Sequence, residues 1–423
     1  MLDDSTSPDA LATDPNPASR AQRLGELARL FFKLGVIGFG GPAAHIAMME
    51  DEVVERRRWL SQQHFLDLIG ATNLIPGPNS TEMTMHVGYA RAGWLGLAVA
   101  GTSFIVPAAL STGILAWAYV EYGTLPAVEP FLVGIKPAVL AVILGALWRL
   151  GKKAIKGWML AVLGVAVGVL LLAGVSEIAA LVVGGVIGMG VLVAVRRNQA
   201  PTLPSDEAAA DDVPLDNRPP DDTPLTKRGW LALLPIPASA LPALTLSGAA
   251  ASVPLWQLGL FFLKVGAVLY GSGYVLIAFL EGDLVDGYGW LTQQQLLDAV
   301  AIGQFTPGPV LTTATFIGYI LGGVPGAIIA TLGIFLPAFV FAGLLHPIVP
   351  KLRKSVWTAA FLDAVNAAAV ALMAVVTLQL GLSVLDGWLP IAIFAVAAML
   401  ALRYKVNAAW LVLGGALAGW LLG

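Results

Sequence analysis

The sequence predicts an all-α polytopic membrane protein made of two inverted-topology repeats, with broken or re-entrant helices at glycine-rich and Pro-Gly-Pro tips. Three observations predict this class. The chain is strongly apolar, with 57% hydrophobic and 12% charged residues and a mean hydropathy of +0.79. One stretch of sequence occurs twice, and the basic loops change sides between the two copies. In a membrane chain such duplication is typical of secondary transporters, whose substrate sites lie at the repeat interface.

The apolar composition indicates helices that cross a lipid bilayer. Runs near 20 apolar residues match the hydrocarbon thickness, and Leu160–Val195 is a region of this kind. The 47 glycines suit close packing of helices in lipid. The chain has no cysteine, which excludes disulfides and thiolate metal sites. A net charge of −3 without a basic stripe argues against nucleic acid, so membrane lipid is the expected surrounding.

The two copies of the repeated sequence are Phe32–Ala108 and Leu263–Ala338. Both copies carry a lysine before a glycine-rich turn, a Trp-Leu-(Ser/Thr)-Gln-Gln motif, a Pro-Gly-Pro motif and a Gly-Tyr pair. An offset of 231 residues links the copies as far as Thr81 and Thr312, and an offset of 230 links them afterwards. The second copy has therefore lost one residue.

Three matched loops exchange their charge between the copies, which predicts that the copies are inverted. Lysine and arginine collect in cytoplasmic loops. In the first copy, the loops 55–58 and 152–156 are basic, and the equivalent loops of the second copy, 286–289 and 383–387, have no basic residue. The third pair is reversed, because 351–354 in the second copy is basic and its equivalent in the first copy, 121–129, is acidic. With these loops assigned, the N-terminus lies in the cytoplasm.

Five parts follow along the chain. We expect a disordered cytoplasmic tail (1–20), an N-terminal repeat (21–197), a polar cytoplasmic linker (198–228), a connecting transmembrane span (229–252) and a C-terminal inverted repeat (253–423). The connecting span is needed because inversion requires an odd number of crossings between equivalent points. Its three prolines, at 235, 237 and 242, make it a poor helix.

Two segments in each copy are interrupted near the middle. Gly38–Pro42 interrupts the first segment of the first copy, and Pro76–Asn79 interrupts the second. The counterparts in the second copy are 271–273 and 307–309. Proline removes an amide donor and glycine lets the backbone turn, so helices break there. Non-helical backbone at membrane depth is tolerated only where it is buried or lines a cavity, so the site is expected at these tips.

The tips favour an anion. Helix N-termini carry unsatisfied N–H groups and a partial positive charge, which favour an oxyanion. The hydroxyls of Thr81, Thr312 and Thr313 and the amide of Asn79 add donors without adding charge. The alternative is that these side chains only cap their helices.

Lys33 and Lys264 lie on otherwise apolar helical runs, just before the glycine tips. An ionisable residue inside a membrane is costly and suggests a function. Two equivalent lysines are suited to neutralising a dianion. The alternative is that each reaches the headgroups or pairs with Glu50 or Glu281.

The predicted substrate-binding residues combine the tips, the two lysines and the flanking amides. They are Lys33, Gly40, Gly41, Asn73, Pro76, Gly77, Pro78, Asn79, Thr81, Lys264, Gly271, Gly273, Gln304, Pro307, Gly308, Pro309, Thr312 and Thr313.

Four titratable residues are candidates for proton coupling: Glu82, His86, Glu50 and Glu281. Glu82 and His86 occur in the first copy only, and histidine titrates near neutral pH. A histidine bonded to a carbonyl and solvated or salt-bridged carboxylates are the alternatives. The sequence has no nucleotide-binding G-x-x-x-x-G-K-(S/T) motif and no cluster of metal-ligand residues, so we expect no cofactor and no metal.

These motifs resemble the bacterial chromate transporter family in its long, two-domain form. The resemblance rests on Phe39-Gly40-Gly41, Glu50, Trp59-Leu60-Ser61, Pro76-Gly77-Pro78, Gly88-Tyr89 and Pro107, and it covers nearly everything except the tail and the linker. It implies a bacterial inner-membrane efflux system for chromate, with antiparallel halves, that confers chromate resistance. The second copy departs from the pattern at Ser272 and Val310, which puts a fully symmetric site in doubt.

The sequence thus predicts a secondary transporter that exports chromate, driven by membrane potential or proton exchange. One alternative is a transporter or channel for sulfate or another oxyanion. A remote alternative is an integral-membrane enzyme with Glu82 and His86 as acid and base, although no partner residues complete such a site. The sequence leaves open whether the chain forms a homodimer.

Overall fold

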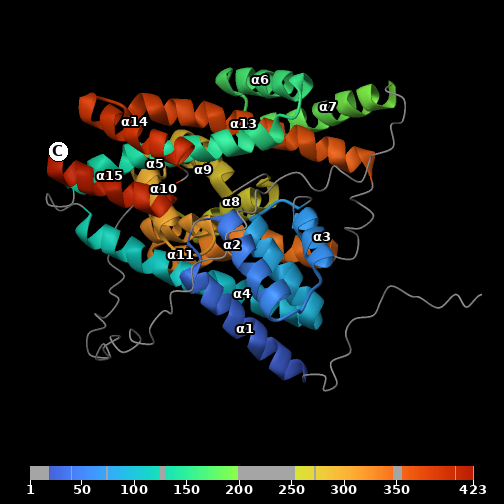
Figure 1. The fold of residues 1–423 in the computed structure, drawn as a ribbon. Coiled ribbons are helices and arrows are strands. Elements are labelled where there is room, and N and C mark those ends of the chain that lie inside the picture. The colour runs from blue at the N-terminus through green and yellow to red at the C-terminus, as the bar shows by residue number, and fades with distance from the viewer. Residues whose placement is uncertain are drawn as a thin grey trace, which may run out of the picture. The chain divides into compact units, whose positions relative to one another are not determined.

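The computed structural model describes residues 19–39, 41–72, 75–123, 129–198, 253–270, 273–345, 355–404 and 406–422. Of the described residues, those up to 193 and from 253 onward belong to one compact unit, and 194–198 belong to a second. Apart from the last turn of α7, every helix described below belongs to the first unit (Figure 1). The predicted linker (198–228) and connecting span (229–252) lie outside the described residues apart from Asn198, as does the predicted tail apart from Ser19 and Arg20.

The first half contains α1 (Arg20–Ile37), α2 (Pro42–Glu50), the π-helix η1 (Asp51–Arg56), α3 (Gln62–Thr72), α4 (Asn79–Tyr122), α5 (Glu129–Ala154), α6 (Trp158–Leu172) and α7 (Glu177–Asn198). The second half contains α8 (Leu255–Val268), η4 (Gly273–Val275), α9 (Leu276–Leu280), the π-helix η5 (Glu281–Gly287), α10 (Gln293–Phe305), η6 (Val310–Thr312), α11 (Thr313–Leu345), α13 (Val356–Val384), α14 (Trp388–Arg403) and α15 (Ala408–Leu422).

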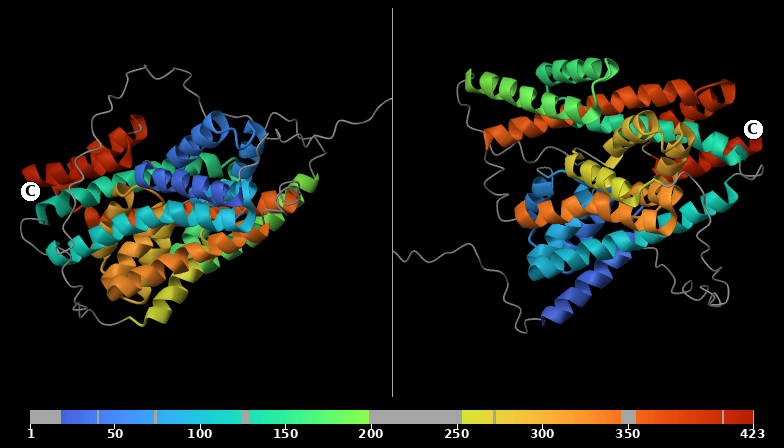
Figure 2. Two further views of the ribbon diagram at one scale, coloured as in Figure 1. Left: turned by 90° about the horizontal axis from the view of Figure 1, so that it is seen from below. Right: turned by 180° about the vertical axis from the view of Figure 1, so that it is seen from behind.

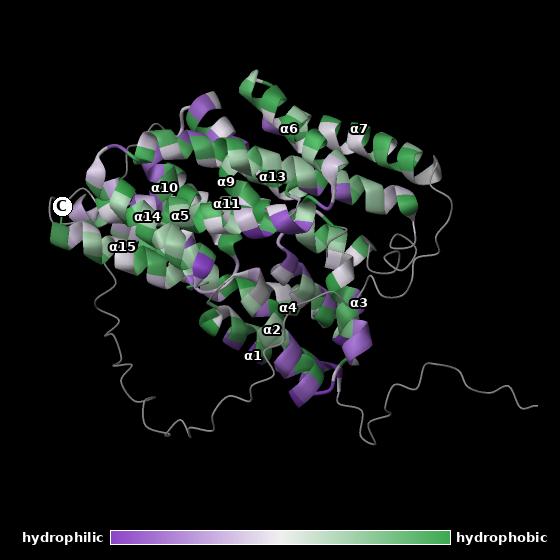
Figure 3. Ribbon diagram, turned by 45° about the horizontal axis from the view of Figure 1, so that its top comes forward, coloured by the Kyte–Doolittle hydropathy of each residue, from purple (hydrophilic) through white to green (hydrophobic). Residues whose placement is uncertain are grey.

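Five helices in the described residues are long and apolar enough to cross a membrane: Asn79–Tyr122, Val133–Ala154, Glu177–Val195, Val310–Leu344 and Val356–Val384. Figure 3 shows apolar residues along most of their length. Large apolar side chains also remain open on the outside, such as Leu382, which is 79% exposed. Apolar surface of this extent suits a lipid environment. The predicted all-α membrane fold is confirmed.

The helices break at the tips that the sequence predicted. In the first half α1 ends at Ile37 and α2 begins at Pro42, where the lack of an N–H costs nothing. Pro78 is extended, with φ −83° and ψ 103°, and α4 begins at the next residue. In the second half α8 ends at Val268, and α10 ends just before residues 306–309. We call 38–41 and 269–272 the glycine tips, and 75–78 and 306–309 the PGP tips.

Helix α4 folds back on itself, which the sequence did not predict. Ala92 (φ −146°) and Gly93 (φ +65°) leave the helical conformation. A Cβ placed on Gly88 would collide with the carbonyl oxygen of Gly96. In a straight helix these two glycines would lie about 12 Å apart, so the limbs on either side of the turn form a helical hairpin.

Helix α11 repeats this hairpin in the second half. Gly322 (φ −152°) and Gly323 (φ +60°) form the turn. A Cβ on Gly318 would collide with the carbonyl oxygen of Gly326, as in α4. The two hairpins therefore have the same turn and the same glycine contact.

The two halves pack into each other. Hairpins α4 and α11 are in contact, with α1 on α4 and α8 on α11. Helix α5 packs against α14 and α15, where Gly134 touches the backbone of Gly415. Helix α13 packs against α6 and α7, which lie beside it in Figures 1 and 2. The last two helices of the first half, α6 and α7, therefore pack against α13 of the second half. The last two helices of the second half, α14 and α15, pack against α5 of the first.

Candidate functional site

Two backbone hydrogen bonds join the tips of one half to the tips of the other. The amide of Gly77 donates to the carbonyl of Leu269 over 2.7 Å, and the amide of Gly308 donates to the carbonyl of Gly38 over 2.8 Å. The offset of 231 residues that relates the copies converts the first bond into the second. Each PGP tip is thus held by the glycine tip of the other half.

The backbone of both PGP tips requires glycine. Gly77 has φ +140° and Gly308 has φ +92°, a region that disfavours side chains. A Cβ on Gly77 would collide with the carboxyl of Glu82, and one on Gly308 would press on Ala108. These contacts fix the tips at the interface between α4 and α11.

The predicted site residues divide into those inside and those outside the described part of the chain. Gly40, Asn73 and Gly271 lie outside the described residues. The hydrogen-bonded tips bring Pro76, Gly77 and Pro78 together with the second glycine tip, and Pro307, Gly308 and Pro309 together with the first. Gly41 has φ +79° and precedes α2, and Gly273 begins η4 against Leu311. Asn79 is half-buried at the start of α4.

The first PGP tip carries two buried polar side chains. Thr81 and Glu82 are both 0% exposed. Within the described residues, neither the hydroxyl of Thr81 nor either carboxyl oxygen of Glu82 has a hydrogen-bond partner. Their amides begin the helix by donating to the carbonyl of Pro78, over 2.8 and 3.0 Å. His86 lies one turn further along and is also buried.

The second PGP tip carries hydroxyls instead of a carboxyl. Thr112 of α4 donates to the hydroxyl of Thr312 over 3.2 Å and lies 3.4 Å from that of Thr306. Thr313 donates to the carbonyl of Val310. The Nε2 group of Gln304 is buried without a partner in the described residues.

Sequence reasoning missed Thr112 and Thr306. The equivalent of Thr112 in the second copy is Ala342, and the equivalent of Thr306 in the first copy is Ile75, so the duplication gives no signal for them. The only signal for Thr112 in the sequence is that it is a threonine on an otherwise apolar helix face. Residues of both halves therefore form this hydroxyl cluster, which has no equivalent at the first PGP tip.

Each predicted lysine forms an ion pair at the same place in its half. Lys33 Nζ lies 2.8 Å from Glu52 Oε1, and Lys264 Nζ lies 2.6 Å from Asp283 Oδ2. The alternative prediction, that the lysines pair with Glu50 or Glu281, is therefore wrong. The reason is the π-helix, whose i→i+5 bonding turns other residues toward the lysine.

Glu50 and Glu281 instead accept equivalent hydrogen bonds from glutamine. Gln62 donates to Glu50 over 2.6 Å, and Gln293 donates to Glu281 over 3.2 Å. Each bond ties a π-helix region to the start of the next α-helix, α3 or α10. These carboxyls have a structural role at equivalent places in the two halves.

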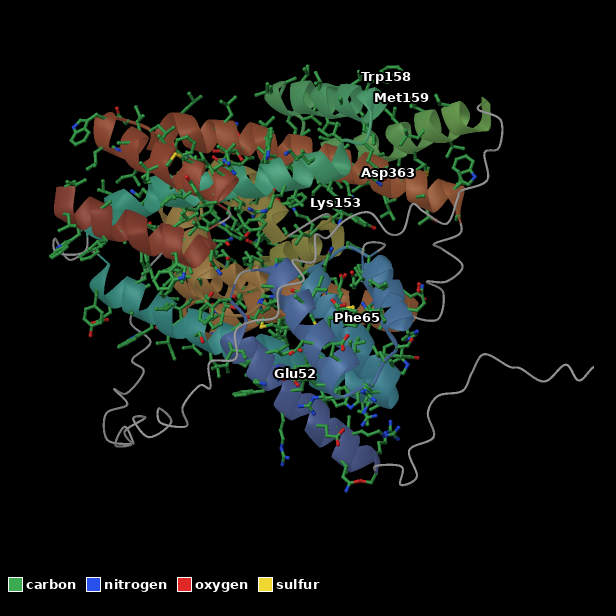
Figure 4. All side chains as sticks on the ribbon, in the orientation of Figure 1. Glu52, Phe65, Lys153, Trp158, Met159 and Asp363 are labelled. Atoms are coloured by element: carbon green, nitrogen blue, oxygen red, sulfur yellow. The ribbon has the colours of Figure 1, made fainter. Side chains whose placement is uncertain are left out.

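The ion pairs around Glu52 (labelled in Figure 4) are richer than those around Asp283. Glu52 also contacts Arg57 over 3.2 Å and Arg56 over 3.7 Å. The hydrogen bond from Lys33 lowers the pKa of Glu52, and Arg57 adds to this effect. Among the described residues, Asp283 by contrast forms an ion pair with Lys264 alone.

Two further polar contacts tie the tips to their surroundings. His45 Nε2 donates to the carbonyl of Gly38 over 2.9 Å, so this carbonyl accepts from both α2 and the other half. Tyr119 donates to the buried carboxyl of Asp298 over 2.7 Å and joins α4 to α10. The described residues hold no group of three His, Asp or Glu side chains suited to a metal.

Comparison with known proteins gives the chain's relatives. The sequence profile described as chromate transporter matches residues 25–189 and 256–420, one segment in each half. The chain is 32% identical to a chromate transport protein of Cupriavidus metallidurans over 97% of this chain and 96% of that protein. It is 32% identical to a probable chromate transport protein of Synechococcus elongatus over 85% of each chain.

A third relative, a chromate transport protein of Pseudomonas aeruginosa, is 31% identical over 96% of this chain and 94% of that protein. No solved structure matches the chain. The family consists of transporters rather than enzymes, and the described part of this chain has five helices that are long and apolar enough to cross a membrane. The chain is a multi-pass membrane protein with both halves matched, and it belongs to the chromate transporter family in its two-domain form.

Proposed function

We propose that this chain is a secondary transporter that exports chromate, or an oxyanion of similar shape and charge, across the bacterial inner membrane. The names of its relatives support chromate as the substrate. The reciprocal hydrogen bonds of Gly77 and Gly308 support the proposal most strongly, because each joins a PGP tip of one half to a glycine tip of the other. Broken helices at a repeat interface are where transporters of this kind bind substrate.

The anion binds at the PGP tips through dipoles rather than through a free cation. The helical hydrogen bonds of α4 begin at the amides of Thr81 and Glu82, so earlier amides point out of the helix end. The hydroxyl of Thr81 adds a donor at the first tip, whereas the hydroxyl of Thr312 donates to the carbonyl of Pro309. The amide of Gln304 is a buried donor beside the second tip.

Lys33 and Lys264 remain part of the proposal as a pair of charges near the glycine tips. Each is held by a carboxylate, so a dianion must compete with Glu52 or Asp283 for the lysine. Lys33→Ala and Lys264→Ala are both expected to impair transport. Full transport by both variants at normal expression removes the lysines from the site.

We propose that the two halves are inverted across the membrane, with the N-terminus cytoplasmic. The end of η1 and the loop after it carry Arg56–Arg58, whereas the end of η5 and the loop after it carry Asp286 and no basic residue. The loops share a backbone, because Arg58 has φ +50° and Gly289 has φ +62°. Their opposite charge supports opposite sides of the membrane.

Topology is testable with single cysteines, since the chain has none. Gln63 and Gln294 are equivalent and exposed, at the starts of α3 and α10. In intact cells a membrane-impermeant maleimide should label Gln294→Cys and spare Gln63→Cys, and inverted vesicles should reverse this. Labelling of both from the same side rejects inversion.

The membrane potential provides a driving force for export. Moving one negative charge outward across an inside-negative membrane is favoured by about 2.3 kcal/mol per 100 mV. Proton exchange is the other candidate driving force, with Glu82, His86, Glu50 and Glu281 as the titratable groups. A passive channel for the same anion, or a transporter of sulfate, is the rival function.

The function is tested by uptake of labelled chromate. Cells that express the chain should accumulate less chromate than control cells, and energised inverted vesicles should take it up against a gradient. Collapse of the potential should abolish uptake by a transporter and leave equilibration by a channel. Equal accumulation in the two cell lines, with no effect of excess sulfate, rejects the oxyanion function.

A further inference from the structure

We infer that Glu82 is a proton-binding site whose protonation is linked to the binding of the oxyanion, so that proton and anion are bound together. The inference rests on the proposed function and deepens it by naming the coupling group and the sign of the coupling.

Glu82 differs from the other buried carboxyls of the described residues. Glu52 contacts Lys33, Glu281 accepts from Gln293, and Asp298 accepts from Tyr119. Glu82 is 0% exposed, and neither of its oxygens has a hydrogen-bond partner in the described part of the chain. Within the described residues no hydrogen bond or ion pair stabilises a charge on Glu82, and only the N-terminal end of α4, in whose first turn it stands, favours one.

A carboxylate in such a place must take up a proton. Removing an ionised carboxyl from water without a partner is far costlier than burying the neutral acid. The conformation seen here is therefore one in which Glu82 is protonated. The proton enters or leaves when the tip opens to water during the transport cycle.

Glu82 sits at the tip and not merely near it. Its carboxyl lies against Gly77, whose amide makes one of the two hydrogen bonds between the halves. Tyr270 follows Leu269, whose carbonyl accepts from Gly77, and lies within electrostatic range of Glu82. Movement of the first PGP tip therefore moves the surroundings of this carboxyl.

The charged and titratable groups around Glu82 do not neutralise its carboxylate in place of a proton. His86 lies one turn along α4, and Tyr270 faces it from the end of α8. On α2, His45 is bound to the carbonyl of Gly38, and on α11 the neighbour of the tip is Ala338. The nearby lysines are engaged by Glu52 and Asp283.

The sign of the coupling follows from charge. An ionised Glu82 repels a dianion at the same tip, whereas the neutral acid does not. By linkage, a proton on Glu82 raises the affinity for the anion, and the anion raises the affinity of Glu82 for the proton by the same factor. The second tip has threonines in place of this carboxyl, so one linked proton accompanies each anion.

One consequence concerns the charge moved. A dianion that crosses with one proton carries a single net negative charge outward. Export is then still favoured by an inside-negative potential, and it opposes an inward proton gradient. Proton antiport is therefore excluded by this inference.

The test is calorimetric binding of chromate to the purified full chain in detergent, in two buffers of different ionisation enthalpy. The difference in heat counts the protons taken up. Wild type should lose affinity by about tenfold per pH unit above the pH at which Glu82 ionises, with uptake approaching one proton. Glu82→Gln should bind chromate with that dependence removed, and comparing the two cancels the titration of chromate itself.

The outcomes are distinct. Equal proton uptake by wild type and Glu82→Gln, or proton release on binding, overturns the role of Glu82. Failure of wild type to bind any chromate overturns the proposed function, and this inference with it. If Glu82→Gln does not fold, the affinity of wild type for the chromate dianion is followed to alkaline pH instead, and an affinity that stays constant until the protein unfolds contradicts the linkage.

Discussion

The backbone amide of Gly77 donates to the carbonyl of Leu269 over 2.7 Å, so a motif of the first half is held by a turn of the second. Gly308 and Gly38 make the equivalent bond in the opposite sense. Because both partners are backbone groups, the junction depends on chain geometry rather than on side-chain identity. Each half alone would leave these tip groups without their partners, which explains why neither tip is complete without the other copy.

The first prediction concerns these two glycines. Gly77→Ala and Gly308→Ala should each lower stability by roughly 1–3 kcal/mol from backbone strain, and more from collisions with Glu82 and Ala108. Transport should be lost in both variants. Melting temperature in detergent and chromate uptake by vesicles measure the two effects.

Gly93→Ala is the matched control for this prediction. Gly93 also has positive φ, at +65°, but a Cβ there has nothing within 4 Å. Gly93→Ala should therefore lower stability through backbone strain alone, and it should retain more transport than the tip variants. Equal loss in all three variants would show that backbone strain, and not the tip junction, limits function.

The second prediction concerns the hairpin of α4. Gly88→Ala places a methyl group against the carbonyl of Gly96, which forces the limbs apart. We expect poor expression and a lowered melting temperature. Gly113→Ala, on the same helix with open space around it, should express normally and gain slightly from helix propensity. Normal folding of Gly88→Ala would contradict the close contact of the limbs.

The third prediction separates the two lysine ion pairs. Lys264→Ala leaves Asp283 without its cation, whereas Lys33→Ala leaves Glu52 with Arg57. Because Lys264 is 40% exposed, we expect a moderate loss of about 1–2 kcal/mol for Lys264→Ala and less for Lys33→Ala.

The double variant Lys264→Ala with Asp283→Asn checks the cause of this difference. It should regain most of the melting temperature, because no unpaired charge remains. A larger loss for Lys33→Ala than for Lys264→Ala, or no recovery in the double variant, would contradict the assignment.

The helix breaks were predictable because proline and glycine act locally. Pro78 and Gly77 end a helix whatever surrounds them, so the PGP tips were found from sequence. The hairpin turn at Gly93 was missed, since a glycine in an apolar run carries no sign of the contact that it permits. That contact joins Gly88 to Gly96 across the turn, which only packing reveals.

Site residues that recur in both copies were predictable from the sequence, and site residues that occur in one copy only were not. The two lysines were found because they recur, yet their partners were missed because η1 and η5 have π-helical geometry. Thr112 reaches the second tip from the first half, and its equivalent is Ala342. A contact between distant segments with no repeat leaves no pattern in a single sequence.

The last prediction uses the pH dependence of Glu281. Burial raises the pKa of this carboxyl to about 7 from 4.5, with Asp286 and Glu177 adding to the rise and the hydrogen bond from Gln293 opposing it. A raised folded pKa favours the neutral acid. Its contribution to stability is therefore present below about pH 4.5 and is lost as the pH rises through 7, by roughly 3 kcal/mol in all.

Glu281→Gln keeps the shape and the link to Gln293 but cannot ionise. Relative to this variant, wild type should lose melting temperature progressively between pH 4.5 and 7. Glu50→Gln, at the equivalent but less buried position, separates the effect of burial from loss of a carboxyl. A constant difference between wild type and Glu281→Gln over this range would show that Glu281 stays ionised in the fold, because only a proton bound in the folded state makes the difference depend on pH.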